Sequence, residues 1–336
     1  MVCSISTEFL LKDSPVIVQN DNLIDIIPIE DIFRTEKHKY EGILDDYKNC
    51  DIWDGDNWAQ IINGKCSRNS KSRCIAIQTR KSVLEIVNAS IAPVVGDTVD
   101  EICYPEQKKY LSSDLNLAKF IGFVVAEGYI SPDGGICITG KDRKILDIYS
   151  QLLCSQYGWK YRLESFASGY KKDSIISRSI ICNDGNFGKW LRNEIYTLRS
   201  HEKRVPKFIL NSSTEVKKSF FEGYYLGDGR KAGHEKYEYK GFTTKSATLA
   251  LGIIYLFQSF SLQKAKCKLD YRGDNKKYFY TQFDCGYITN KGIHRRKNRN
   301  EIIKIINTKN SDGWLYSLET NNNVFASGAN LIQITK

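Results

Sequence analysis

The sequence predicts an α+β protein in which two pseudo-symmetric repeats are inserted in an all-β domain made from both ends of the chain. Two apolar helical runs end in the same acidic signature, 101 residues apart. Each run is followed by the same order of strands, helix and basic hairpin, which predicts an αββαββα order for each repeat. The flanks alternate apolar and polar residues between short turns, which is typical of small all-β folds.

The two acidic signatures predict a pair of tightly packed helices. In each run, a glycine lies four residues before another small residue, and small residues at this spacing let helix backbones almost touch. A glycine after the last turn is a helix stop. We therefore expect Glu127 and Asp228 side by side at two helix ends. The runs read Phe120-Ile-Gly-Phe-Val-Val-Ala-Glu127-Gly128 and Phe221-Glu-Gly-Tyr-Tyr-Leu-Gly-Asp228-Gly229.

Two adjacent carboxylates repel each other and demand a cation. Hard divalent ions such as Mg²⁺ prefer oxygen ligands of this kind. Glu127 and Asp228 are therefore predicted as metal ligands and catalytic groups. The alternative is a pair of buried helices with chance acidic ends.

The segments after the two signatures match in order, which implies a pseudo-twofold unit. The first repeat is expected at about 114–210 and the second at about 214–300, within a domain spanning 108–300. Residues 1–107 and 301–336 would then form the split all-β domain. The matching segments are strand pairs at 129–139 and 236–244, helices at 141–153 and 246–257, and hairpins at 161–176 and 264–284.

Charge is distributed unevenly along the 336 residues, whose net charge is +10. Residues 1–107 carry a net charge of −7, residues 108–300 carry +17, and residues 301–336 carry 0. A basic excess confined to the repeats predicts a polyanionic partner for that region, and nucleic acid is the obvious one. The sequence contains no run of about 18 uncharged apolar residues, so no membrane-spanning helix is expected.

The ten cysteines are spread singly, without a CxxC pair or a Cys/His cluster, so a structural zinc site is not expected. They are read as small buried hydrophobes of a protein in a reducing compartment, the nucleus or the cytoplasm.

The hairpin of the second repeat carries cations on alternate residues, which share one face of a strand. A twisted sheet with a basic face fits the major groove of DNA, whereas the alternative is an ordinary solvated face. The candidate DNA contacts are Lys160, Arg162, Lys264, Lys266, Lys268, Arg272, Lys276 and Lys277.

The two signatures resemble those of LAGLIDADG homing endonucleases in their single-chain, two-repeat form. The resemblance implies a monomer whose motif helices form the interface between the repeats. Sheets beneath them would hold duplex DNA with a long asymmetric target site. The acids would bind Mg²⁺, and cleavage of both strands would leave short 3′ overhangs.

A lysine also follows from this resemblance. The stretch Ser200-His-Glu-Lys203-Arg-Val-Pro206 is similar to a family block that carries a catalytic lysine ahead of the second motif. Lys203 lies 76 residues after Glu127, and the same offset from Asp228 reaches Lys304. The second lysine is therefore expected to be Lys304 or Lys297, and either could instead be a phosphate contact.

The flanks resemble a Hint domain, the intein-type splicing domain, of the kind found in family B DNA polymerases. The stretch Gly313-Trp-Leu-Tyr-Ser-Leu-Glu-Thr320 is close to the C-terminal block of such inteins. The positions that carry splicing chemistry depart from the pattern, because the chain lacks the expected histidine near residue 89 and a terminal His-Asn pair. These positions are Cys3, Ala89, Ser90, Gln333, Ile334 and Thr335.

Together these features predict a site-specific, Mg²⁺-dependent double-strand DNA endonuclease derived from an intein that has lost splicing. Isoleucine has no side-chain amide with which to cyclise, so Ile334 is the most severe departure. Two alternatives remain open: a splicing-active intein that carries an endonuclease, and a non-catalytic DNA- or RNA-binding protein of the LAGLIDADG type.

Overall fold

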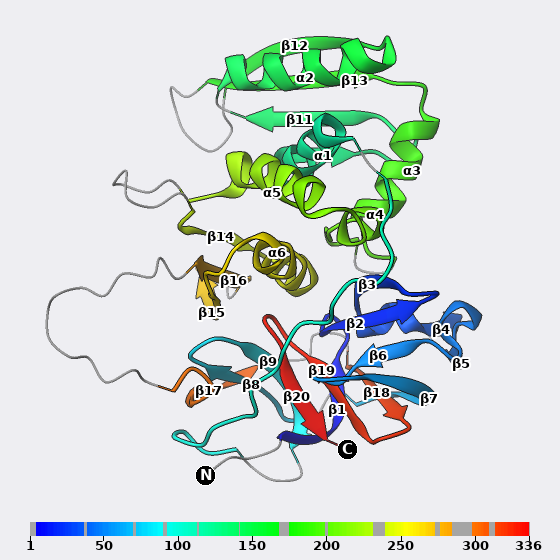
Figure 1. Cartoon of the computed structure of the whole chain (residues 1–336), viewed down its shortest axis with the longest axis vertical. Helices are drawn as coiled ribbons and strands as arrows, with labels where there is room; N and C mark the ends of the chain where they lie inside the picture. The colour runs from blue at the N-terminus through cyan, green and yellow to red at the C-terminus, as the bar shows by residue number, and fades with distance from the viewer. Residues whose placement is uncertain are drawn as a thin grey trace, which may run out of the picture.

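The structure is a computed structural model with mixed α+β architecture (Figure 1). A large β domain lies at one end of the long axis, and helices with smaller sheets are stacked above it. No described helix is long and apolar enough to cross a membrane. The described residues are 5–36, 39–69, 72–89, 93–112, 114–140, 142–167, 175–198, 201–230, 239–272, 276–283, 298–308 and 313–335.

Both ends of the described chain contribute to the β domain. Its strands run in the order β17-β8-β9-β1-β18-β7-β6-β2-β19-β20, β3 pairs with β2, and β20 returns to pair with β1. The pairs of this sheet are antiparallel except β1–β20, which is parallel. The chain therefore makes one domain from two segments far apart in sequence, with an apolar core of its own.

The strands of the β domain are β1 (Ile5–Leu11), β2 (Pro15–Asn20), β3 (Leu23–Pro28), β6 (Asp51–Trp53), β7 (Trp58–Arg68), β8 (Cys74–Thr79), β9 (Val83–Ala89), β17 (Ile302–Thr308), β18 (Trp314–Thr320), β19 (Val324–Ser327) and β20 (Ile332–Thr335). The hairpin β4 (Phe33–Glu36) and β5 (Lys39–Ile43) and the short helices η1 (Ile29–Ile32) and η2 (Asp45–Tyr47) accompany them.

The middle of the chain carries the helices and the two smaller sheets. The first repeat has the order α1 (Leu115–Glu127), β10 (Gly128–Ile130), β11 (Ile136–Gly140), α2 (Arg143–Tyr157), β12 (Lys160–Ala167), β13 (Ile175–Cys182) and α3 (Asn186–Ile195). After α4 (Lys207–Leu210), the second repeat contains α5 (Thr214–Asp228), β14 (Gly241–Thr244), α6 (Ala247–Phe260), β15 (Ala265–Arg272) and β16 (Lys276–Phe283). Part of the predicted strand at 236–244 lies outside the described residues.

Helices α1 and α5 pack through their glycines, as the spacing of small residues predicted. A Cβ on Gly122 would lie 2.0 Å from the carbonyl oxygen of Phe220. A Cβ on Gly223 would lie 1.9 Å from that of Lys119. Only glycine allows backbones to approach this closely, so these positions fix how the two helices cross.

The ends of the two helices fall where the sequence predicted, but the following glycines serve another purpose. Gly128 has φ −94° and Gly229 has φ −65°, so neither adopts the left-handed conformation of a glycine helix cap. A Cβ on Gly128 would lie 2.6 Å from the Val124 carbonyl oxygen, and one on Gly229 would lie 2.1 Å from that of Tyr225. The glycines provide room for the chain to turn sharply out of each helix.

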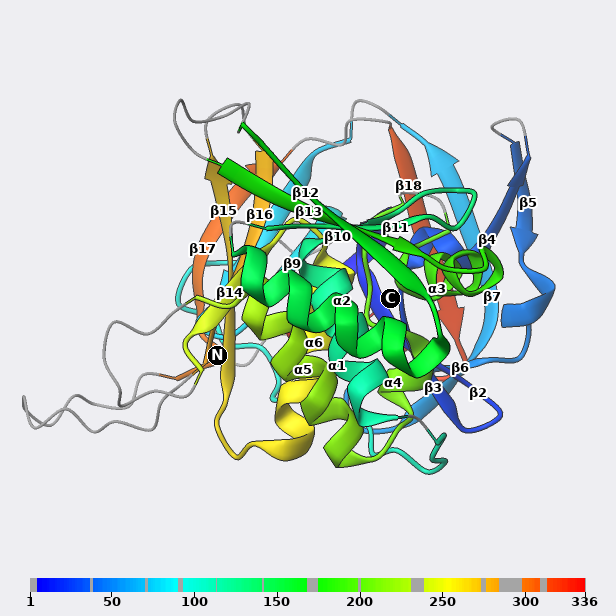
Figure 2. The ribbon, with the colours of Figure 1, turned by 90° about the horizontal axis from the view of Figure 1, so that it is seen from above.

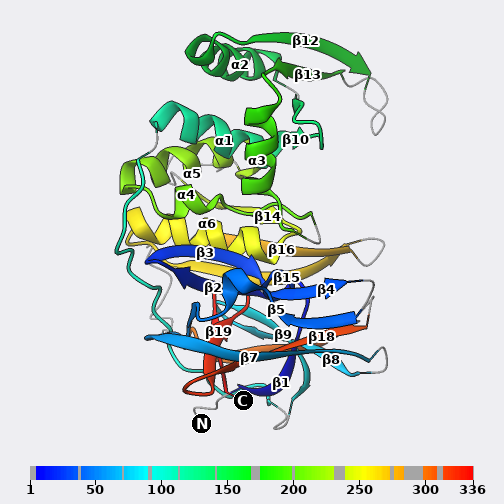
Figure 3. The same ribbon diagram turned by 90° about the vertical axis from the view of Figure 1, so that its right-hand side faces the viewer.

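The two smaller sheets lie on either side of the helix pair. The first has the order β10-β11-β13-β12 and the second β14-β16-β15. In Figures 2 and 3 the hairpins β12–β13 and β15–β16 extend toward the same side of the molecule. In Figure 3, α1 and α5 lie between the levels of these hairpins. The helix pair and its carboxylates therefore lie between two sheets.

Candidate active site at two helix ends

The two carboxylates predicted from the sequence are the last residues of the paired helices. Glu127 ends α1 and Asp228 ends α5. A Cβ on Gly227 would lie 2.6 Å from the Cβ of Ala126 and 3.5 Å from Oε1 of Glu127. The backbone before Asp228 thus passes directly against the Glu127 side chain, and the two acids share one environment.

Lys203 reaches the same place from a short extended segment. Its backbone pairs with Tyr196 in an isolated antiparallel bridge. Its Nζ donates to the carbonyl oxygens of Val125 at 2.8 Å, Gly128 at 2.6 Å and Val124 at 3.4 Å. These carbonyls belong to the end of α1, where backbone acceptors lack helical partners and the helix dipole favours a cation. The lysine therefore caps the helix that ends in Glu127.

The protonation equilibria of the three groups are linked. Burial raises the pKa of Asp228 to about 7, and repulsion from Glu127 adds to this, while Lys203 and the nearby Tyr224 hydroxyl oppose it. Burial also raises the pKa of Glu127, against the attraction of Lys203. Burial lowers the pKa of Lys203 to about 8, against the attraction of both acids. Near neutral pH the acid pair thus retains part of a proton, which a bound cation would displace.

Glu127 and Asp228 form a donor pair that fits a hard divalent cation. Among the described residues, no cluster of three or more His, Cys, Asp or Glu side chains occurs. Mg²⁺ is usually held by one or two carboxylates together with water and substrate phosphates. Glu127 and Asp228, partly buried with raised pKa values, provide such a pair.

The second lysine is not where the repeat offset predicted it. Lys304 lies on β17, where its backbone pairs with Gln78 of β8, and its side chain is exposed. It therefore belongs to the β domain and not to the second repeat, which begins with α5. The equal offset failed because the second repeat ends before residue 304. Lys297, the other candidate, lies outside the described residues.

The second sheet has a basic and aromatic face. Residues paired across β15 and β16 point to the same side, so alternate positions from both strands share this face. Arg272 stacks over Tyr278 at 4.7 Å, and Arg230 stacks over Tyr280 at 3.9 Å. This face, called the second face below, consists of Lys266, Lys268, Asp270, Arg272, Lys276, Tyr278, Tyr280 and Gln282.

Lys277 does not belong to the second face, so its prediction as a DNA contact was wrong. It follows Lys276, and adjacent strand residues point to opposite sides of a sheet. Its Nζ is 2.6 Å from Glu85 and pairs with Asp13, both in the β domain. The two carboxylates raise the pKa of Lys277 strongly against the effect of burial. Lys277 therefore anchors the second sheet to the β domain.

Lys264 also lies apart from the centre of the second face. It precedes β15, and its Nζ is 3.9 Å from Glu101, with both side chains largely exposed. Glu101 belongs to the segment between β9 and α1, so Lys264 lies at the margin of the second face.

The outward face of the first sheet differs in character. Lys160 and Arg162 are exposed on β12. Glu164 lies between two arginines, 2.8 Å from Arg162 and 2.7 Å from Arg178. This first face also presents apolar side chains, among them Phe166 and Ile180. Its positive charge is thus partly neutralised within the sheet.

The described positions among those expected for splicing chemistry, Ala89, Gln333, Ile334 and Thr335, lie on strands of the β domain. Ile5 of β1 pairs with Ile334 of β20, so the two ends of the described chain run side by side. Ile334 is fully buried in the β-domain core, and Thr335 follows it at the end of β20. Gln333 donates through Nε2 to the backbone oxygen of Asp54 at 2.9 Å. Ala89 ends β9 opposite Thr7, whereas Cys3 and Ser90 lie outside the described residues.

Sequence reasoning missed the aromatic members of the site. Tyr224 is fully buried one turn before Asp228. Its position four residues before the acid was a usable signal, since such residues share a helix face. Tyr278 and Tyr280 alternate with Lys276, so strand periodicity could have placed them on the second face.

Comparison with known proteins gives partial matches. No model of a known protein family matches this chain. The DNA polymerase of Thermococcus sp. (strain GE8) is 26% identical over 163 residues, which is 46% of this chain and 9% of the polymerase. The DNA polymerase of Acanthamoeba polyphaga mimivirus is 31% identical over 131 residues, which is 38% of this chain and 7% of the polymerase. Each match thus covers a small part of the relative and less than half of this chain.

Similar solved structures include a variant of I-DmoI in complex with its target DNA and in the presence of manganese. It has 12% identity and a TM-score of 0.37, covering 51% of this chain and 87% of that one. The homing endonuclease I-WcaI, bound to its DNA recognition sequence, has 15% identity and a TM-score of 0.36, covering 52% and 78%. The N-terminal LAGLIDADG domain of WhiA has 13% identity and a TM-score of 0.34, also covering 52% and 78%. These TM-scores are low, so the similarity between the folds is weak.

Proposed function

We propose that this protein is a site-specific, double-strand DNA endonuclease that requires Mg²⁺. The observation that carries the proposal is the meeting of Glu127, Asp228 and Lys203 at two helix ends between two sheets. Mg²⁺, when bound, would supply Lewis-acid stabilisation of the phosphate and an activated water.

The residues of the chain would divide the remaining work. Glu127 and Asp228 come from different repeats, so each would face one scissile phosphate of the duplex, leaving short 3′ overhangs. Both acids would have to lose their protons to hold the metal, which their raised pKa values make dependent on pH. Lys203 would hold α1 in place and contribute positive charge beside the phosphate.

The two sheet faces would hold the DNA on either side of the site. Lys268, Arg272 and Lys276 on the second face suit phosphate contacts, and Tyr278 and Tyr280 add rigid contact area. The first face is less basic and more apolar. Because the faces differ, we expect a single chain to bind a long, asymmetric target.

The β domain is proposed as an intein-derived domain that has lost splicing. The partial matches to DNA polymerases agree with the resemblance of the flanks to polymerase inteins. Burial of Ile334 in the β-domain core supports a structural use of the position where splicing needs an asparagine. Ligation of two reporter segments placed around the chain, detected by mass spectrometry, would instead identify an active intein.

The nuclease proposal is tested by selecting cleaved duplexes from a random DNA library with Mg²⁺. We expect one long, asymmetric sequence to be recovered with the wild-type protein and none with Glu127→Gln. Recovery of bound but uncut DNA by the wild-type protein would identify a non-catalytic binding protein.

A further inference from the structure

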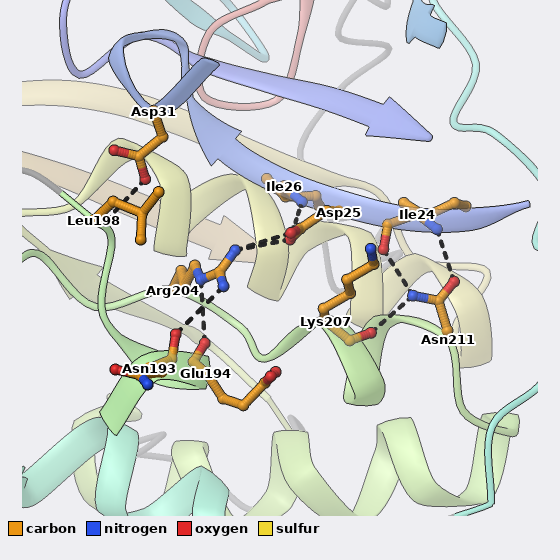
Figure 4. Close-up of polar contacts among 10 residues, drawn as sticks. All are labelled: Ile24, Asp25, Ile26, Asp31, Asn193, Glu194, Leu198, Arg204, Lys207 and Asn211. Carbon is orange, nitrogen blue, oxygen red and sulfur yellow. Dashed lines mark hydrogen bonds and ion pairs between the residues drawn. The ribbon is translucent and has the colours of Figure 1, made fainter. Parts of the chain in front are cut away.

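The segment that carries Lys203 is extended, so its neighbouring side chains point in opposite directions. The backbone of this segment pairs with the end of α3: Thr197 N donates to Glu202 O at 2.8 Å, and Arg204 N donates to Ile195 O at 2.8 Å. Lys203 faces the end of α1. Arg204 therefore faces away from the acids, toward the β domain (Figure 4).

Arg204 forms the principal ionic contact on that side. Its Nη1 lies 3.0 Å from both carboxylate oxygens of Asp25, a residue of β3. Its Nε donates to the backbone oxygen of Glu194 at 3.1 Å. Only 14% of the Arg204 side chain and 11% of the Asp25 side chain are exposed. Charge-assisted contacts of this kind are strong and directional, and here the guanidinium joins β3 to the backbone that carries the lysine.

The chain on both sides of Lys203 is attached to the β domain as well. The Leu198 amide donates to Oδ2 of Asp31 at 3.0 Å. Asn211 accepts from the Ile24 amide at 2.8 Å and donates to the Ile24 carbonyl oxygen at 2.7 Å (Figure 4). Lys203 therefore lies in the middle of a segment held at three places by β3 and η1.

We propose that Asp25 is a positioning residue for Lys203. Through Arg204, it fixes the extended segment so that the Lys203 ammonium meets the end of α1 beside Glu127 and Asp228. The β domain is then a working part of the active site rather than a passive attachment. This inference rests on the proposed nuclease function for its catalytic consequence, but the placement of Lys203 can be tested without it.

The first test measures how accessible Lys203 is in metal-free protein. An N-hydroxysuccinimide ester acylates exposed lysines, and peptide mass spectrometry gives the rate at each site. Lys203 should react slowly in the wild-type protein and at least about fivefold faster in Asp25→Asn. Arg204→Lys keeps the charge but cannot contact Asp25 and the Glu194 backbone oxygen through separate nitrogens, so it should show a smaller increase. The exchange of Asp25→Arg with Arg204→Asp should restore protection.

The matched control is Glu301→Gln, which removes a 3.0 Å pair with Arg80 without touching the Lys203 segment. It should leave labelling of Lys203 unchanged. Far-ultraviolet circular dichroism confirms that each variant compared is folded. Equal labelling in Asp25→Asn, Arg204→Lys and Glu301→Gln would overturn the proposal.

The second test is single-turnover cleavage of the selected DNA site. Asp25→Asn should lower the rate at saturating protein by about tenfold or more, since small displacements of catalytic groups are costly. Its DNA affinity should stay within about twofold of wild type, because the second face is unchanged. A change in affinity alone would contradict a positioning role. Absence of cleavage by the wild-type protein would refute the nuclease function, whereas the labelling result would still decide the placement of Lys203.

Discussion

The two sheets beside the helix pair have the same strand order over most of their length but differ on both faces. On the first sheet, Glu164 pairs with Arg162 and Arg178 on the outward face. On the second, Asp270 pairs with Arg272, but further lysines surround them. The inner face of the first sheet is covered by α2, where Ser150 lies 2.5 Å from Ser179. The inner face of the second sheet packs against α6, where the Phe257 and Phe283 rings stack at 3.9 Å, and it also carries Lys277, which is tied to the β domain.

This difference predicts that the two repeats, despite their similar strand order, have different roles in stability and in DNA binding. The second sheet adds an ionic anchor in the β domain to its packing against α6, and its outward face carries lysines and arginine that are not matched by as many carboxylates. The first sheet stands apart from the β domain (Figure 3). We therefore expect changes in the second repeat to affect both stability and DNA affinity more than matched changes in the first.

The largest expected effect comes from breaking the ionic anchor. Lys277→Met leaves Asp13 and Glu85 without their cation in a buried place, which typically costs about 3–5 kcal/mol. The control Lys276→Met changes the exposed neighbour and should alter stability little. Urea unfolding monitored by fluorescence measures both, and equal stabilities would contradict the anchor.

A second comparison contrasts two glutamates. Burial raises the pKa of Glu202 to about 7, reinforced by Asp13 and opposed by Lys277, whereas hydrogen bonding to Arg178 lowers the pKa of Glu164. Because the folded state favours protonated Glu202, stability is full below the ordinary pKa near 4.5 and is lost as the pH rises through 7.

Glu202→Gln should therefore stabilise the protein at pH 8, by at most about 3 kcal/mol, and have little effect at pH 4. Chemical unfolding of wild type and variant across this range measures the difference. A variant that is equally destabilised at both pH values would refute the burial cost assigned to Glu202.

The next effect concerns DNA affinity. Replacing Lys268 and Lys276 together by glutamine should weaken binding by about tenfold at moderate salt. It should also reduce the slope of log affinity against log salt by up to about 0.9 for each phosphate that the variant no longer neutralises. The matched double change of Lys160 and Arg162 on the first face should have a smaller effect, because Glu164 already neutralises part of the charge of Arg162. Fluorescence anisotropy at several salt concentrations measures the DNA affinity of each variant. Equally weakened binding by the two variants would contradict the proposed difference between the two faces.

The smallest expected effect has the opposite sign. Glu164→Gln releases Arg162 and Arg178 from their carboxylate and should tighten DNA binding by a few-fold, about 1 kcal/mol or less. The same anisotropy titration measures this change. Weaker binding by this variant would show that Glu164 itself contributes to recognition.

The sequence predicted the parts of the site that depend on local patterns. The spacing of the glycines predicted the contact between α1 and α5, because small residues four positions apart let two helix backbones touch. The acids follow these glycines at the helix ends, so their proximity was predicted as well. Alternation along β15 correctly placed Lys266 and Lys268 on one face. It could not separate Lys276 from Lys277, because the phase of a returning strand depends on the register that the intervening turn sets.

Contacts between segments far apart in the chain could not be predicted, because they leave no pattern in the local sequence. Asp25 and Arg204 are separated by 179 residues, and neither is unusual in its local sequence. Their meeting depends on how the β domain packs against the segment before α5. Lys304 was misplaced for a related reason, because a constant offset assumes repeats of equal length while β17 already belongs to the β domain.

The most direct test of the account is strand-resolved cleavage of the selected DNA site in Mg²⁺, with each strand labelled separately. Wild type should cut both strands. Asp228→Asn and Glu127→Gln should lose double-strand cleavage, with rates reduced by about 10² or more, while DNA affinity is retained because the second face is unaltered. Cleavage of both strands at the wild-type rate by either variant would contradict the assignment of the active site to the paired helix ends.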